Sequence, residues 1–226
     1  MEFHTIDFCG TKIMTTVTSS AKVVDQWISR IHQIHHRRMS KLILGLDIEW
    51  LPYFPPEEPN PVAILQICVG HRCLIFQLLY NDTIPRSLRE FLANPDFTFV
   101  GVGVKEDAVK LLEDWNLIVG GTMDLAEEAA KKYGVDYYKR IGLKRLAMAL
   151  IGKSMKKPKH VTLSQWDSRK LSDEQVEYAA IDAYVSFKLG MLLMKNDHGR
   201  KYHSTGHSHC CHDHMPLRLS ETNCVV

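Results

Sequence analysis

The first 80 residues alternate between strand-like and helix-like patterns of apolar and polar side chains. Ser19 and Ser20 precede a stripe of apolar residues at helical spacing, from Val23 to Ile34, which predicts an amphipathic helix with a serine N-cap. The segments on either side of this helix have the short apolar or alternating runs that are typical of β-strands. The strands predicted in this part of the chain are 2–8, 12–18, 42–50, 61–69 and 72–77.

Turn signals predict how these strands pair. Cys9-Gly10-Thr11 separates the first two runs, and the two-residue turn Gly70-His71 separates the last two, which is a common hairpin length. This register places Cys68 opposite Cys73. In a reducing compartment we interpret both cysteines as packed thiols.

After residue 86, helical and strand patterns follow one another regularly. Ser172 and Gln175 have the spacing of a capping box, which marks the start of the last helix. Hairpin-linked strands followed by strand–helix units are typical of an α/β fold, in which a mixed sheet carries helices on both faces. The helices predicted here are 87–93, 105–115, 125–133, 143–151 and 173–195, with strands at 97–101 and 121–124.

The composition is that of an ordinary globular protein from the cell interior. The chain has 226 residues and a net charge of +2, so a nucleic-acid or membrane partner would need a local basic patch. No apolar run reaches the ~18–20 residues that span a bilayer, and the N-terminus lacks the layout of a secretory signal. Because the six cysteines show no CxxC spacing, a disulfide scaffold is not expected. We expect no membrane association and a location in the cytoplasm, the nucleus or both.

The end of the chain differs from the rest in character. Residues 196–226 contain six of the 12 histidines, three of the six cysteines and almost no apolar periodicity. We therefore predict a folded domain at 1–195 and a disordered tail at 196–226. The run from His207 to His214 contains ligands for Zn²⁺ or Cu²⁺ without the spacing of a structural zinc site, so specific and adventitious binding both remain open.

Asp47 and Glu49 are the first carboxylates that stand out from the apolar pattern. Residues two apart on a strand project to the same face, so both side chains lie together at the edge of a core. Two like charges there repel each other and lose hydration unless a cation compensates them. Hard oxygen ligands select Mg²⁺ or Mn²⁺ over Zn²⁺, although a single Asp-x-Glu also occurs by chance in a chain of this length.

Two further groups of residues carry candidate chemistry. Tyr178 and Asp182 are four residues apart on the last predicted helix and share one face, where the alternative is a half-buried tyrosine beside a solvated aspartate. Asp107 lies in the first turn of another predicted helix, where the helix dipole favours an acid in any case. Gly101 and Gly103 precede it but lack the third glycine of a dinucleotide fingerprint.

Taken together and in this order, these segments resemble the DEDD superfamily of 3′–5′ exonucleases, in the subclass with tyrosine in the last motif. The resemblance covers about residues 40–193 and extends to the Werner-syndrome-type exonuclease domain and its small stand-alone plant relatives, with RNase D as a more distant relative. The matching segments are Asp47-Ile48-Glu49-Trp50, Ala63-Ile64-Leu65-Gln66-Ile67, Phe99-Val100-Gly101-Val102-Gly103 leading to Asp107, Gly142 to Gly152, and Trp166 to Tyr184.

The resemblance implies a fold, an activity and a set of site residues. The fold would be RNase H-like, a five-stranded mixed sheet with helices on both faces, extended by the N-terminal strand pair and helix. The activity would be metal-assisted hydrolysis of phosphodiester bonds from the 3′ end of a nucleic acid, releasing nucleoside monophosphates. By match to the motifs, Asp47, Glu49 and Asp182 would hold one Mg²⁺ or Mn²⁺, and Asp47 would bridge to a second ion. Asp107 would support that second ion through water, and Tyr178 would orient the attacking water.

Candidate substrate contacts lie just after the first motif and before the last one. Trp50 and Leu51 offer a stacking surface for terminal bases, although Trp50 is equally well explained as core. Lys153, Lys156 and Lys157 belong to the densest basic run of the chain. A loop there would track phosphates, and the alternative is a solvated lysine-rich loop.

Other interpretations remain open at this stage. A catalytically silent nucleic-acid-binding module would keep the same fold, and an interaction protein would act through its tail. No residue can be assigned a contact to the 2′-OH from the sequence, so RNA and DNA are both candidate substrates. Homo-oligomer formation is also left open.

Overall fold

The computed structural model describes residues 1–52 and 58–195, so the predicted tail at 196–226 lies outside the described residues. The secondary structure follows the predicted order. Within the described residues, the strands are β1 (Glu2–Phe8), β2 (Thr11–Thr18), β3 (Ile43–Glu49), β4 (Ile64–Val69), β5 (Arg72–Gln77), β6 (Thr98–Gly101) and β7 (Gly121–Asp124). The helices are α1 (Ala21–His35), α2 (Arg86–Leu92), α3 (Val104–Trp115), α4 (Leu125–Tyr133), α5 (Leu143–Ile151), α6 (Lys159–Thr162) and α7 (Asp173–Leu193). Short 3₁₀ helices lie at His36–Lys41, Leu78–Tyr80 and Asp136–Arg140.

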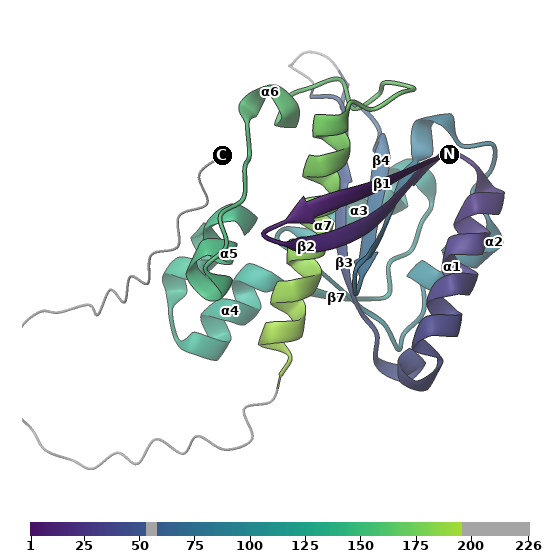
Figure 1. Cartoon of the computed structure of the whole chain (residues 1–226). Helices are drawn as coiled ribbons and strands as arrows, with labels where there is room; N and C mark the ends of the chain where they lie inside the picture. Colours follow the sequence, from purple (N-terminus) through teal and green to yellow (C-terminus); the bar gives the residue numbers. More distant parts are fainter. Residues whose placement is uncertain (53–57, 196–226) are drawn as a thin grey trace, which may run out of the picture. The chain divides into compact units, whose positions relative to one another are not determined.

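All of these strands belong to one mixed sheet with the order β1-β2-β5-β4-β3-β6-β7 (Figure 1). β3, β4 and β5 form an antiparallel ladder, and β6 and β7 continue from β3 in parallel. β2 pairs with β5 in parallel, so the N-terminal hairpin extends the five-stranded core sheet to seven strands. The predicted α/β class with a mixed sheet is confirmed, and the N-terminal strand pair is part of the main sheet.

Both hairpin turns lie where the sequence predicts them, although Thr11 pairs with Phe8 and the first turn is therefore only Cys9-Gly10. Cys9 and Gly10 have φ values of 50° and 79°, which is the conformation of a type I′ turn and matches the twist of the paired strands. In the second hairpin Cys68 lies directly opposite Cys73, as predicted. Both of these thiols are buried and free.

Helices cover both faces of the sheet and define two layers. The apolar layer lies between the sheet and α1, α2 and α3, and it includes Leu44, Leu46 and Ile48 from β3. The site layer lies between the sheet and α4, α5 and α7, and Ile43 at the start of β3 packs into it. Alternate residues of one strand therefore enter different layers. Among the described helices, none is long and apolar enough to cross a lipid bilayer.

Helix α7 crosses β3 at very short range. A Cβ atom on Gly45 would lie 1.9 Å from the carbonyl oxygen of Ala183, so only glycine allows this approach. The start of α7 is fixed by the predicted capping box, in which Ser172 Oγ accepts from the Gln175 N–H and Gln175 Oε1 accepts from the Ser172 N–H. The crossing brings Asp182 against the strand that carries Asp47.

Three details differ from the sequence prediction. Helix α6 lies within the lysine-rich segment, where no helix was predicted. Ser20 stands at the N-cap of α1 without a side-chain capping bond, and Asp82 Oδ1 accepts from the Ala21 N–H at 2.8 Å instead. Strand and helix ends also shift by a few residues, which is the usual uncertainty of a terminal turn or strand end.

Candidate active site

Three elements bring together the five residues of the predicted motifs. β3 carries Asp47 and Glu49 at its end, α3 carries Asp107 in its first turn, and α7 carries Tyr178 and Asp182 one helical turn apart. The carboxylates are close enough that their charges perturb one another, as the pKa values below show. The structure therefore places the predicted motif residues on elements that pack against one another.

The pKa values of the β3 and α3 carboxyl groups are strongly raised. Burial, followed by the charge of Asp182, raises the pKa of Asp47 from 3.8 to about 7, although the Lys157 charge and the Ile48 N–H partly offset the shift. Burial, followed by the charges of Asp47 and Asp182, raises the pKa of Glu49 well above its ordinary value. Burial and the Asp47 charge raise the pKa of Asp107 to about 8. The site therefore contains more negative charge than its own donors compensate.

Asp182 and Tyr178 form the α7 side of the site. Asp182 is only 1% exposed, and its burial raises its pKa despite a hydrogen bond from Tyr178 and the charge of Lys157. Burial and the nearby carboxylates also raise the pKa of the Tyr178 phenol above its ordinary value of 10.0. At neutral pH this phenol keeps its proton, so it suits the donation of a hydrogen bond rather than the role of a base.

Lys157 enters this site from the loop between α5 and α6. Its Nζ lies 2.6 Å from Asp182 Oδ2 and 5.2 Å from the centre of the Tyr178 ring. The Lys157 side chain is 28% exposed, and the Asp182 side chain only 2%. The sequence assigned Lys157 to a phosphate-tracking loop together with Lys153 and Lys156, whereas the structure places its ammonium at the carboxylates.

Asp124 supports the segment that carries Asp107, and the sequence prediction missed this role. Its Oδ2 accepts from the Gly103 N–H at 2.7 Å, and its Oδ1 caps α4 by accepting from the Ala126 N–H at 2.8 Å. Gly103 has a φ of 80° and directly precedes α3. The available signal was an aspartate followed three residues later by Glu127, which is the pattern of a helix start.

Gln66 is a second residue without a predicted role. It lies directly opposite Asp47 in the β3–β4 ladder, so both side chains project to the site layer. The residue is 0% exposed, and neither its Oε1 nor its Nε2 has a hydrogen-bond partner among the described residues. A single amide within the apolar strand β4 was the available signal. Because a buried amide without partners is costly, its presence needs an explanation beyond packing.

The remaining predicted contacts lie in different surroundings. Trp50 is partly buried and packs against the apolar layer, with Lys110 Nζ 5.2 Å from the centre of its ring. Leu51 is half-buried, and its carbonyl accepts from Asn60 Nδ2 at 3.1 Å. Lys153 and Lys156 are both exposed on the loop before α6. Stacking by Trp50 and Leu51 stays a prediction, and the structure adds a core contact for Trp50.

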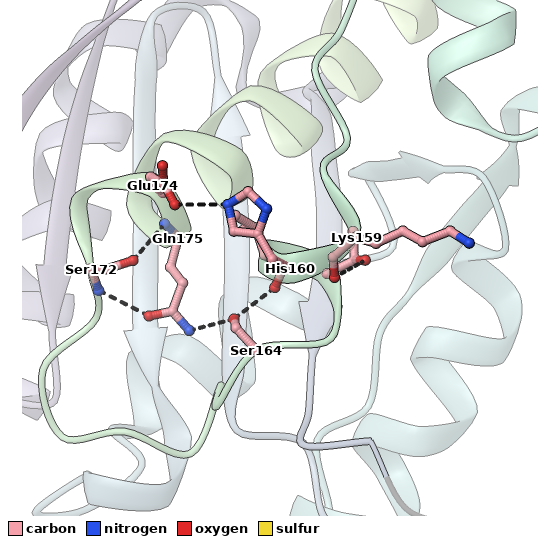
Figure 2. A network of polar contacts seen from close by, with 8 residues as sticks. Lys159, His160, Ser164, Ser172, Glu174 and Gln175 are labelled. Atoms are coloured by element: carbon pink, nitrogen blue, oxygen red, sulfur yellow. Dashed lines mark hydrogen bonds and ion pairs between the residues drawn. The ribbon is translucent and has the colours of Figure 1, made fainter.

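A polar network ties α6 to the first turn of α7 (Figure 2). The His160 ring lies 3.1 Å from Glu174 Oε2, and Gln175 Nε2 donates to Ser164 Oγ at 2.9 Å. Gln175 also belongs to the capping box with Ser172, as Figure 2 shows. This network anchors the segment that follows Lys157, directly before the helix that carries Tyr178 and Asp182.

A small cavity adjoins the site on this side. It has a volume of about 140 Å³ and is lined by apolar groups of Pro158, Val161, Tyr178 and Ile181 and by the charged side chains Lys156, Glu174 and Glu177.

The donor set suits a hard divalent cation. Burial raises the pKa of all four carboxyl groups, and carboxylate oxygens are the ligands that hard divalent cations prefer. Asp182 Oδ2 is buried and has no well-aligned hydrogen bond among the described residues, so its contact with Lys157 is an ion pair. Within the described part of the chain, no three acidic, histidine or cysteine side chains are gathered as a ready metal site. The residues fit a metal ion chemically, while the cation in contact with them is the Lys157 ammonium.

Comparison with known proteins identifies a family. A sequence model of that family, described as 3′–5′ exonuclease, matches residues 15–196. A 3′–5′ exonuclease of Arabidopsis thaliana is 36% identical over 151 residues, which cover 66% of this chain and 52% of the relative. The mouse bifunctional 3′–5′ exonuclease/ATP-dependent helicase WRN is 31% identical over 155 residues, which cover 66% of this chain and 11% of that protein.

A solved structure supports the fold. Escherichia coli RNase D, an exoribonuclease involved in structured RNA processing, superposes with a TM-score of 0.67 at 17% identity. The match covers 80% of this chain and 44% of the RNase D chain. At this identity the similarity concerns the fold. The chain spans about half of the length of the Arabidopsis relative and less than half of the mouse WRN and RNase D chains.

Proposed function

The chain belongs to the 3′–5′ exonuclease family, and from that membership we propose that it hydrolyses phosphodiester bonds of nucleic acid from the 3′ end. The observation that carries the proposal is that Asp47, Glu49, Asp107 and Asp182 are buried and near enough for their charges to act on one another, with Tyr178 beside Asp182. The exonuclease domain of the proposal is 1–195, since the family match covers 15–196.

Mg²⁺ or Mn²⁺ is the proposed cofactor, with two ions per site. Asp47, Glu49 and Asp182 would hold one ion, and Asp47 with Asp107 would hold the other, the latter through water. When bound, the ions would activate water and stabilise negative charge on the phosphate oxygens. Carboxylate oxygens without competing sulfur or imidazole ligands favour these hard cations over Zn²⁺.

The protein side chains have distinct roles in this proposal. Tyr178 keeps its phenolic proton and orients water or a phosphate oxygen by hydrogen bonding. Lys153 and Lys156, which are exposed before α6, contact phosphates of the incoming strand. Trp50 and Leu51 are the proposed apolar contacts to the terminal bases.

The test is a nuclease assay on single-stranded RNA and DNA labelled at the 3′ or the 5′ end, together with a recessed duplex. Each substrate is incubated with Mg²⁺, Mn²⁺ or EDTA. We expect products that shorten from the 3′ end and that depend on the metal. The substitution Asp47→Asn should lower the rate by ~10²–10³-fold or more, whereas Asp96→Asn, at an exposed position before β6, should not.

The outcome also decides between the two open interpretations. Equal rates in the wild type and in pure Asp47→Asn would contradict the assignment of the site. Retained nucleic-acid binding without any hydrolysis would favour the catalytically silent module of the same fold. The preferred substrate would decide between RNA and DNA.

A further inference from the structure

The three lysines of the loop between α5 and α6 are not equivalent. Lys153 and Lys156 are exposed, whereas the Lys157 side chain turns inward and places Nζ 2.6 Å from Asp182 Oδ2. The same ammonium lies over the Tyr178 ring, which favours a partly desolvated cation. A side chain that only tracks phosphates at the surface has no reason to occupy this position.

Three carboxylates of the site act on the Lys157 ammonium. Asp182 is on α7, and Asp47 and Glu49 are at the end of β3. The Lys157 charge acts favourably on Asp47, Glu49 and Asp182 alike. Lys157 thus compensates the carboxylate cluster with a charge that the chain itself supplies.

A metal ion and this ammonium compete for the same oxygen. Asp182 Oδ2 lies within ion-pair contact of Lys157 and is also a proposed metal ligand. Two cations a few ångströms apart in a buried site repel each other strongly, because little solvent screens them. Metal binding and the ammonium at its described position therefore oppose each other strongly.

The Lys157 side chain can change its position without a change in the helices around it. Residues 152–158 have no regular secondary structure, and α6 directly after them is anchored to α7 by the network of Figure 2. Lysine also has a long, flexible side chain. The ammonium can leave Asp182 without disturbing the helix that carries the catalytic candidates.

We propose that Lys157 is an exchangeable counter-ion of the carboxylate site. In the absence of metal its ammonium neutralises Asp182, and when metal ions bind it moves off to contact a phosphate oxygen of the nucleic acid. This second step rests on the proposed exonuclease function, whereas the exchange with the metal does not. The role differs from that of a structural ion pair, which would have to stay intact in every state.

The substitution Lys157→Met distinguishes an exchangeable counter-ion from a structural ion pair, because its effects on metal affinity and on hydrolysis should have opposite signs. Without nucleic acid, it should bind Mn²⁺ about tenfold more tightly than the wild type by titration calorimetry, since a competing charge is gone. In EDTA it should unfold at a lower temperature, since the carboxylates lose their counter-ion. Hydrolysis at saturating metal should be at least about tenfold slower, because the phosphate contact is lost. Lys156→Met is the matched control for the first two measurements and should change neither.

A labelling experiment on the wild type avoids any dependence on a variant that folds poorly. Acetic anhydride followed by mass spectrometry should modify Lys157 several-fold faster with saturating Mg²⁺ than in EDTA, whereas Lys156 should be modified at one rate in both. Lys157 labelling that stays unchanged or falls as metal binds would overturn the proposal, as would weaker Mn²⁺ binding by Lys157→Met or no metal binding at all. An absence of hydrolysis together with the expected labelling would contradict the proposed function and leave the metal exchange standing.

Discussion

The two layers of this protein use the same strand in opposite ways. On one side of β3, Leu44, Leu46 and Ile48 pack into an apolar layer whose members are almost completely buried. On the other side, Asp47 and Glu49 face α7 in a layer that also buries charge. Neighbouring residues of β3 therefore belong either to the apolar layer or to the carboxylate site, because successive side chains of a strand point to opposite faces.

The two layers contribute differently to the free energy of folding. Burial of apolar side chains stabilises the first layer by ~25 cal/mol for each Å² removed from water. The second layer also contains Gln66, whose buried amide oxygen and nitrogen have no hydrogen-bond partner among the described residues. Such atoms each cost ~1–3 kcal/mol. Apolar burial in both layers therefore offsets the cost of the polar groups that one of them contains.

Breaking the apolar layer should have the largest effect on stability. Phe99 is 0% exposed and lies edge-on to Phe91, with 6.4 Å between ring centres. The substitution Phe99→Ala should lower the free energy of unfolding by ~3–5 kcal/mol, because it leaves a cavity between tightly packed groups. Urea denaturation measures this loss, and a change below ~1 kcal/mol would mean that the layer repacks easily.

The stability of the protein should depend on pH through the buried carboxyl groups of the site layer. The pKa of Asp47 is about 7 and that of Asp107 about 8, against an ordinary value of 3.8, so the folded protein keeps protons that the unfolded chain has released. In EDTA, the contribution of these two carboxyl groups to the free energy of unfolding is fully present below about pH 4. It is lost as the pH rises through 7 and 8.

Melting temperatures in EDTA at about pH 5 and about pH 8.5 measure this loss. The fall should be smaller in Asp47→Asn, which serves as the reference for all other titrating groups. Saturating Mg²⁺ should raise the melting temperature more at the higher pH, where the ligands are charged. A wild-type stability that rises with pH relative to Asp47→Asn would contradict the buried-charge account.

Replacing Gln66 should have a smaller effect on stability than Phe99→Ala, and one of opposite sign. Its amide has no partner among the described residues, so Gln66→Met should raise the free energy of unfolding by ~1 kcal/mol. Gln77 is the matched control, because its Nε2 donates to the carbonyls of Ser168 and Arg169 at 3.2 and 3.1 Å. Gln77→Met should therefore destabilise the protein by a similar amount.

Chemical denaturation of both variants sharpens the comparison between satisfied and unsatisfied amides. Destabilisation by Gln66→Met would mean that its amide has a partner in the folded protein. A gain in stability together with a loss of hydrolysis would show that Gln66 serves the site at the expense of the fold.

Local signals in the sequence predicted most of the elements. The capping box of Ser172 and Gln175 is a contact between residues three apart, and it forms as predicted. Ser20 was an equally good local signal, but Asp82 caps the helix instead, from 61 residues further along the chain. A capping group that distant depends on how the connecting elements pack, and no local pattern contains that information.

The candidate site also combines features that local patterns predict with features that depend on tertiary packing. The spacing of Asp47 with Glu49, and of Tyr178 with Asp182, predicts shared faces because strand and helix periods are regular. No periodic pattern in the sequence predicts that Lys157 turns inward or that the Gln66 amide is left without a partner among the described residues. Both depend on which groups the fold places around them.

The sequence by itself determined the α/β class, the order of the elements, and the residues that could form a carboxylate site. These properties follow from periodicities and motifs that act over a few residues. The tertiary structure alone decided that β2 joins β5 in parallel, that α7 crosses β3 at Gly45, and that Lys157 reaches Asp182. These are contacts between segments far apart in the chain, and their free energy depends on the packing of the elements between them.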